Sequence, residues 1–398
     1  MFHRIFQSNR VTPLNIQSDT SIDSNEDETT NSNVQAIKTL DNLLLISGFA
    51  YLCDQDLRAN KIIRIFNWPI IILEIFNLIR FTLYLFLNGN SFEKLIIGDH
   101  IWLATSLPGT NLMAIIIAVR IIANGILLNL NEKHHFNWIV IINFMRRKVT
   151  FEELSLSEAA SVKMYSILKI CINVTKIMTY LVFLLVGSGI TIPITLIQIS
   201  IFNEKHLSLF FFILIWKFLN LFTALISIAN MMVTPMLFFF ICYYCKLRAS
   251  QLNEIIAKMI KKPIYMTGNR VLNMIKEHEA ICNMIEKYNK FWSKVFYIAI
   301  VTSILQSLVI IKGISSLLKE ELTVHTLIWT ILYIIGLASV WVYVFFVTSC
   351  CASVTKEIHK SHKKLGKLQW MLEDKDLKIK VIYFNAFGLY DCFLTFLF

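Results

Sequence analysis

The residues whose chemistry could serve a reactive site are few, and their spacing does not match the common site types. His278 and Glu279 are followed by Cys282 and not by a second histidine, so the zinc-protease spacing is absent. Cys242 and Cys245 have the C-x-x-C spacing, but no second pair follows and their surroundings are apolar. This context favours a packing role for both thiols over a metal site. We therefore expect no metal and no cofactor.

Groups for catalysis are also missing from the sequence. It contains no Gly-x-Ser-x-Gly motif and no glycine-rich loop of the kind that holds phosphate. Within the apolar stretches the only carboxylates are Glu74 and Asp391, which are too few for the acid clusters typical of proton-coupled carriers. The sequence therefore argues against an enzyme.

Polar and aromatic side chains recur in five apolar stretches, at what we expect to be a similar depth. Trp and Tyr near a membrane surface often form the interfacial belt. The second interpretation is a ligand pocket that is mostly apolar with a few polar anchors. The candidate pocket residues are Trp102, Thr191, Gln198, Trp216, Lys217, Asn220, Gln306, Trp329 and Tyr333.

Composition places these residues in a membrane protein. Of the 398 residues, 56% are hydrophobic and 16% are charged, whereas soluble domains have about 25% charged residues. A membrane-spanning helix needs about 20 apolar residues, and this length predicts an all-α polytopic protein. The predicted spans are 65–87, 101–127, 172–202, 208–245, 292–316, 324–350 and, with only 17 residues, 382–398.

The basic residues predict the orientation of these seven spans. With a cytosolic N-terminus, the segments on the inner side hold 29 Lys and Arg residues and the outer segments hold three. This asymmetry follows the positive-inside rule, is inverted relative to G-protein-coupled receptors, and explains the net charge of +11 without nucleic acid. The predicted organisation is a disordered cytosolic tail (1–38), spans one to four (39–245), a cytosolic helical anchor (246–291), spans five and six (292–350), a cytosolic anchor helix (351–381) and the start of span seven (382–398).

The cytosolic segment before the fifth predicted span has a pattern of its own. From Val271 to Trp292, one residue in every three or four lies on a seam with a period of 3.5 residues. Such a seam predicts helix–helix packing, with polar positions that set its register. It continues without a break into the fifth span, so we expect one long helix. The candidate packing residues are Ile275, His278, Ile285, Asn289 and Trp292.

Three stretches resemble the arthropod seven-transmembrane chemoreceptors, and the gustatory receptors more closely than the related odorant receptors. The first, ICYYCKLRASQLNEII (241–256), ends the fourth predicted span. The second, HEAICNMIEKYNKFWSKVF (278–296), is similar to a His–Glu helix of the family that ends in Asn-x-Phe. The third, FNAFGLYDCFLTFLF (384–398), resembles the start of the final helix of the family. The order, spacing and inverted orientation of these stretches support the resemblance.

The resemblance implies a ligand-gated, non-selective cation channel of four subunits in the plasma membrane, opened by a small organic tastant or odorant. The final helix of the family lines the ion pathway and continues to a Thr-Tyr and Gln-Phe ending, which this sequence does not reach at Phe398. Two alternatives follow: an incomplete sequence, or a subunit that does not conduct by itself. The implied pore and gating residues are Phe387, Gly388, Leu389, Tyr390 and Thr395.

Two other functions remain open at this point. A secondary transporter would favour an internal repeat, and the sequence shows none. A non-conducting accessory subunit would share the family features without the pore. Homomeric and heteromeric assembly with related subunits are equally compatible with the sequence.

Overall fold

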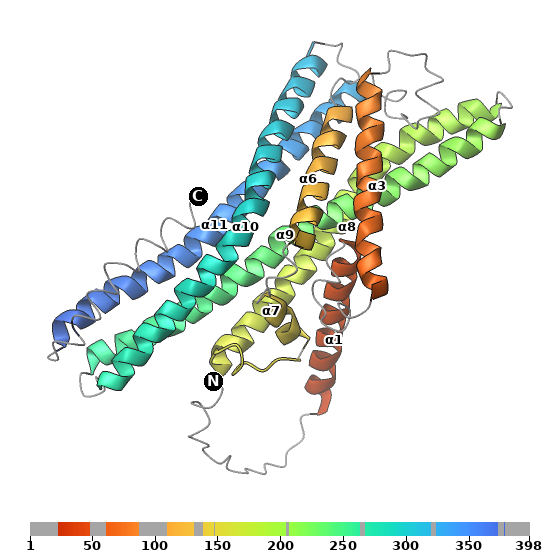
Figure 1. Cartoon of the computed structure of the whole chain (residues 1–398). Coiled ribbons are helices and arrows are strands. Elements are labelled where there is room, and N and C mark those ends of the chain that lie inside the picture. Colours follow the sequence, from red (N-terminus) through yellow and green to blue (C-terminus); the bar gives the residue numbers. More distant parts are fainter. Residues whose placement is uncertain are drawn as a thin grey trace.

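The computed structural model describes residues 23–47, 61–86, 110–130, 138–146, 148–203, 207–262, 267–319, 324–372 and 378. The described residues contain no strand. Their helices, shown in Figure 1, are α1 (Asp23–Ile46), α3 (Lys61–Phe86), α6 (Thr110–Leu130), α7 (Trp138–Met145), α8 (Glu158–Asn203), α9 (Leu207–Lys261), α10 (Gly268–Leu317) and α11 (Val324–Met371).

Four of these helices are much longer than a membrane is thick. They have 46, 55, 50 and 48 residues, and at about 1.5 Å per residue each exceeds the roughly 30 Å hydrocarbon core. All four contain a window apolar enough to cross a membrane, in Glu158–Ser188, Phe210–Lys261, Gly268–Leu317 and Tyr333–Met371. The chain is therefore an all-α, membrane-embedded protein. The prediction that the seam and the fifth span form one long helix is confirmed by α10, and α9 likewise continues past the end of the fourth predicted span.

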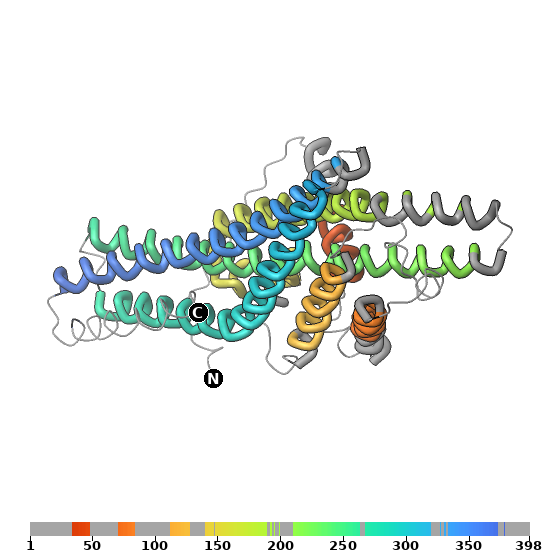
Figure 2. Tube along the Cα trace, turned by 90° about the horizontal axis from the view of Figure 1, so that it is seen from above, coloured from red at the N-terminus to blue at the C-terminus, as the bar shows by residue number. Residues whose placement is uncertain are grey.

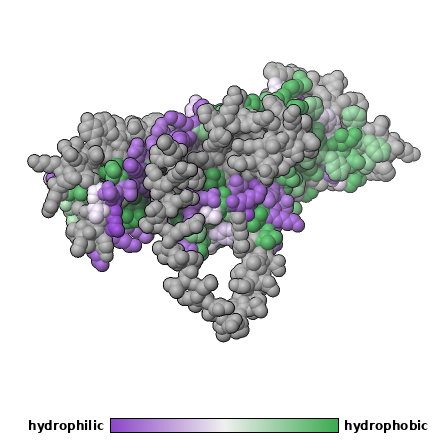
Figure 3. Space-filling model, turned by 60° about the horizontal axis from the view of Figure 1, so that its bottom comes forward, coloured by the Kyte–Doolittle hydropathy of each residue, from purple (hydrophilic) through white to green (hydrophobic). Residues whose placement is uncertain are grey.

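Helix α9 is the centre of the packing. It runs diagonally through the molecule in Figure 1 and along its length in Figure 2, and it contacts every other helix that the structure describes. In its apolar window 78% of the residues are buried, against 22% in α8 and 11% in α11. Leu184, Phe218 and Phe345 are large apolar residues that remain more than 60% exposed. Hydrophobic surface gathers at the right-hand end of Figure 3, where α8 and α9 meet. Such surface suits contact with lipid.

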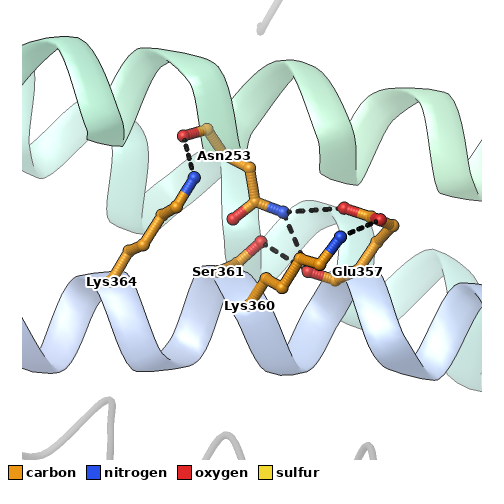
Figure 4. A network of polar contacts seen from close by, with 5 residues as sticks. All are labelled: Asn253, Glu357, Lys360, Ser361 and Lys364. Carbon is orange, nitrogen blue, oxygen red and sulfur yellow. Dashed lines mark hydrogen bonds and ion pairs between the residues drawn. The ribbon is translucent and has the colours of Figure 1, made fainter.

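Helices α9, α10 and α11 also have polar halves, at residues 246–261, 268–291 and 351–371, which pack together beyond the apolar windows. Figure 4 shows one contact there, in which Asn253 of α9 lies between Glu357 and Lys364 of α11. Asn253 Nδ2 donates to the Glu357 carbonyl at 2.9 Å, and Lys364 Nζ donates to the Asn253 carbonyl at 2.9 Å. Because side chains satisfy backbone carbonyls across the interface, the two helices are held in one register. Residues 246–261, 268–291 and 351–371 thus contribute to one bundle.

The N-terminal segment corrects one prediction. Residues 1–38 were expected to be disordered, but α1 begins at Asp23. The polar composition obscured an apolar face on which Ala36, Leu40 and Leu44 are buried, and α1 packs against α8 and α9. An ion pair of 2.6 Å between Arg146 Nη2 and Asp41 Oδ1 joins α1 to the end of α7. Burial of this face offsets the weak helical preference of the Ser- and Asn-rich sequence.

Candidate functional site

The nine candidate pocket residues do not form one described group. Trp102 lies outside the described residues, and so do the side chains of Thr191, Gln198 and Trp329. The other five residues lie in three different places, at the α3–α9 contact, at the α8–α9 contact and between α6, α10 and α11. They are Trp216, Lys217 and Asn220 on α9, Gln306 on α10 and Tyr333 on α11.

Trp216 and Asn220 belong to a row of polar contacts between α3 and α9, which we call the α3–α9 polar ladder. Ser227 Oγ donates to Glu74 Oε1 at 3.2 Å, and Asn77 Nδ2 donates to Thr223 Oγ1 at 3.1 Å. Successive members are three or four residues apart on each helix and therefore share one face. The ladder consists of Glu74, Asn77 and Arg80 on α3 with Trp216, Asn220, Thr223 and Ser227 on α9.

Arg80 is the charged end of the ladder. Its side chain is 3% exposed, and its Nη2 donates to Asn220 Oδ1 at 2.6 Å. The guanidinium carbon lies 4.7 Å from the centre of the Trp216 ring and 4.8 Å from that of Phe81. Phe76 stacks on Trp216 with the ring centres 6.1 Å apart. Hydrogen bonding and cation–π contact together stabilise a cation in an apolar setting. Trp216 and Asn220 thus hold an arginine of their own chain.

Lys217 lies on a different side of α9. Its Nζ donates to Thr195 Oγ1 of α8 at 3.0 Å. Next to it, Trp216 faces α3 through its contact with Arg80. Because neighbouring residues on a helix point about 100° apart, the two cannot line one pocket wall.

The second group lies between α6, α10 and α11, and we call it the α6–α10–α11 polar cluster. Gly313 of α10 faces the Tyr333 ring, and Gly336 of α11 faces Ile310. The two helices run antiparallel, and their register places Ser303 of α10 at the same height as Tyr343 of α11. The centre of the Tyr343 ring is 4.7 Å from the guanidinium carbon of Arg120. The cluster comprises Arg120 and Asn124 of α6, Ser303 and Gln306 of α10, and Tyr333 and Tyr343 of α11, and all but Tyr343 are less than 9% exposed.

Close contact at Gly313 gives a first prediction. A Cβ at this position would lie 3.0 to 3.3 Å from three atoms of the Tyr333 side chain. Gly313→Val is therefore expected to destabilise the protein by about 1–3 kcal/mol through overpacking, and Tyr333→Ala in the same chain should recover part of that loss. Thermal unfolding of the purified protein in detergent measures both effects. Gly187→Ala is the matched control, since its Cβ would meet only Leu221 at 3.7 Å. A Gly313→Val protein as stable as this control would contradict the predicted clash.

The anchor residues lie in the polar half of α10. Ile275, His278, Ile285 and Trp292 are buried, and Asn289 is partly exposed. His278 Nδ1 lies 3.5 Å from the Cys282 thiol one turn later. Burial, with a smaller contribution from the charge of His362 on α11, lowers the pKa of His278 from 6.5 to about 4.

This lowered pKa gives a second prediction. The unfolded chain binds a proton at His278 near pH 6.5, whereas the folded chain binds it only near pH 4. Stability is thus complete above pH 6.5 and falls as the pH decreases toward 4, by about 2 kcal/mol between pH 7 and pH 5. Thermal unfolding across this range should show a smaller decrease in His278→Gln. His359→Gln removes an exposed histidine and should retain the wild-type decrease. Equal pH profiles for wild type and His278→Gln would rule out this contribution.

The structure places the cysteines of the C-x-x-C pair but not the implied pore residues. Cys242 and Cys245 are buried in the hydrophobic core of the bundle. The implied pore residues lie outside the described residues: Phe387, Gly388, Leu389, Tyr390 and Thr395.

Sequence reasoning did not identify Arg80 or Arg120. A signal was present, since Glu74, Asn77 and Arg80 recur every three residues in an otherwise apolar helix. Ionisable residues at such positions usually face the interior of the bundle. The sequence does not state which helix faces them.

No protein-family model matches the chain, and no curated protein matches it. What the structure defines is a class: an all-helical, membrane-embedded protein whose longest helices continue beyond their apolar windows into a second, polar bundle.

Proposed function

We propose that the chain is a chemosensory, gustatory-type receptor that acts as a subunit of a ligand-gated, non-selective cation channel in the plasma membrane. The observation that carries the proposal is the continuity of α9, α10 and α11. Each is one helix from an apolar half, where buried polar groups lie between helices, to a polar half, where the helices form a bundle. A small molecule bound among the apolar halves would thus act on elements that extend to the opposite end of the protein.

Such a ligand opens a channel only if it binds the open form more tightly than the closed form. The α6–α10–α11 polar cluster is suited to this role because three separate helices contribute to it. A ligand that contacts all three fixes their relative positions. The polar halves of α10 and α11 then transmit the change to the bundle. The resemblance of the three sequence stretches to arthropod chemoreceptors supports the same function.

The proposal includes seven spans with a cytosolic N-terminus, and the basic residues support this orientation. Epitope tags at the N-terminus and between Lys262 and Thr267 should be reached by antibody only after the cells are permeabilised. The second site joins the ends of α9 and α10 that belong to the polar bundle. A tag between Asn203 and Leu207, where α8 meets α9, is the matched control and should be labelled on intact cells. The opposite labelling pattern would contradict the proposed orientation.

The function itself is tested by voltage clamp. The full chain, expressed alone and with related receptor subunits, is exposed to a panel of small amphipathic organic compounds. We expect a ligand-evoked current that reverses near 0 mV, because a non-selective pore passes both Na⁺ and K⁺. Surface-expressed protein that binds a ligand but gives no current in either setting would contradict the channel function.

A secondary transporter is the second candidate, and the α3–α9 polar ladder is the observation that favours it. The ladder buries Glu74 and Arg80 among apolar helices, at 2% and 3% exposure. Ionisable groups in such places often mark ion or proton pathways. A transporter would accumulate substrate in proteoliposomes under a proton or sodium gradient, and Glu74→Gln would abolish this coupling. A channel would show no accumulation.

A further inference from the structure

We infer that the α6–α10–α11 polar cluster is a binding site for an organic carboxylate, with the guanidinium of Arg120 as the group that recognises it. The inference rests on the proposed function in one respect, since it specifies the ligand class of that receptor. Its own content is narrower: a carboxylate binds to Arg120, whether or not binding opens a pore.

The first observation is that the charge of Arg120 is buried without a counter-ion among the described residues. The residue is 2% exposed, and its Nε and Nη2 have no hydrogen-bond partner among the described residues. No ion pair within the described part of the chain includes Arg120. The apolar halves of α6, α10 and α11 contain no Asp or Glu at all. A buried guanidinium without a counter-ion is strongly unfavourable, so a site of this kind favours an anion.

The second observation concerns the hydroxyl groups of Ser303 and Tyr343. Ser303 Oγ is also buried without a hydrogen-bond partner among the described residues. Tyr343 Oη interacts with Arg120 itself, and the register of α10 and α11 places Ser303 at the level of Tyr343. Both hydroxyls can donate, so α10 and α11 offer donors at the level where the Tyr343 ring contacts the guanidinium. A group with several lone pairs and a negative charge fits this arrangement best.

The geometry of the donors selects the kind of anion. Arg presents its N–H groups as a planar fork that matches the two oxygens of a carboxylate. The Tyr343 ring lies against the guanidinium and leaves Nε and Nη2, which form one edge of the fork, without a partner in the described region. The surroundings are apolar, because the Tyr343 ring packs against the main hydrophobic core. A carboxylate with a short alkyl chain satisfies both the fork and these surroundings.

The test measures binding directly. The full chain, purified and reconstituted in nanodiscs, is titrated at pH 7.5 with hexanoate and with hexan-1-ol, which have the same alkyl chain length. We expect hexanoate to raise the unfolding temperature in a saturable manner and hexan-1-ol to have little effect. Arg120→Gln should raise the apparent Kd for hexanoate at least tenfold, and Arg120→Lys should keep part of the affinity because it retains the charge but not the fork.

Two further variants keep the test independent of folding. Ser303→Ala should weaken hexanoate binding by about three- to tenfold, in line with the loss of one hydrogen bond to a charged group. Lys312→Gln removes an exposed cation of α10 outside the cluster and should leave the Kd unchanged. Without ligand, Arg120→Gln should unfold at the same temperature as wild type or higher, because it removes an uncompensated buried charge.

Three results would overturn the inference. They are the absence of stabilisation by hexanoate, equal stabilisation of wild type and Arg120→Gln, and a large loss of stability in ligand-free Arg120→Gln. The third would show that another group of the protein already neutralises Arg120. None of them concerns conduction. Conversely, intact hexanoate binding without any evoked current would contradict the channel proposal alone.

Discussion

Ile285→Asp is expected to disrupt the polar bundle, with a loss of about 4 kcal/mol or more. Ile285 is completely buried, at 0% exposure, in the hydrophobic core that α9, α10 and α11 share. A carboxylate at this position has neither water nor a partner, so it must remain desolvated or become protonated. Since the stability of a whole domain is only about 5–15 kcal/mol, much of the protein should lose this bundle. Thermal unfolding and limited proteolysis of the polar half measure the effect.

Asn283→Asp is the matched control for this substitution. It introduces the same carboxylate on the same helix two residues earlier, at a position that is exposed. Its stability should remain within about 0.5 kcal/mol of wild type. Membrane insertion should persist in both variants, because the apolar half of α10 is unchanged. An Ile285→Asp protein with wild-type unfolding and protease resistance would show that this part of α10 is not packed as described.

The burial of Ile285 also identifies the partners of the seam. The sequence indicated only that this segment packs against other helices. In the structure, residues of the seam are buried within a single chain, against α9 and α11. The period of 3.5 residues thus predicted packing correctly, but the identity of the partner helix depends on contacts that are distant in sequence.

Helix continuity was similarly accessible from the sequence, while the polar contacts between spans were not. The unbroken seam pattern predicted α10, and the gap between the predicted spans 172–202 and 208–245 falls where α8 ends and α9 begins. By contrast, Trp216 and Asn220 were chosen for their expected depth, and depth does not reveal the face on which a residue lies. Their actual partner, Arg80, is 140 residues away from Asn220 in the sequence. Side-chain chemistry within a span becomes informative only when the neighbouring helix is known.

Asn220→Leu is expected to cost about 3 kcal/mol, because it removes the acceptor of a buried cation. Arg80 Nη2 donates to Asn220 Oδ1 at 2.6 Å, and leucine cannot accept this bond. The guanidinium stays charged in its buried position, where the Trp216 and Phe81 rings are among its remaining contacts. Phe222→Leu is the control on the same helix, because Phe222 is 56% exposed on the apolar surface. It should change the unfolding temperature little.

The double variant Arg80→Leu/Asn220→Leu gives the decisive comparison. Removing one partner leaves a desolvated group behind, whereas replacing both by apolar side chains removes the charge together with its acceptor. The double variant should therefore be more stable than the sum of the single losses predicts, with a coupling of about 1–3 kcal/mol. Thermal unfolding of all four proteins in detergent completes the cycle. If the two losses simply add, Arg80 and Asn220 do not depend on each other, and the α3–α9 polar ladder is a set of separate contacts instead of one stabilising unit.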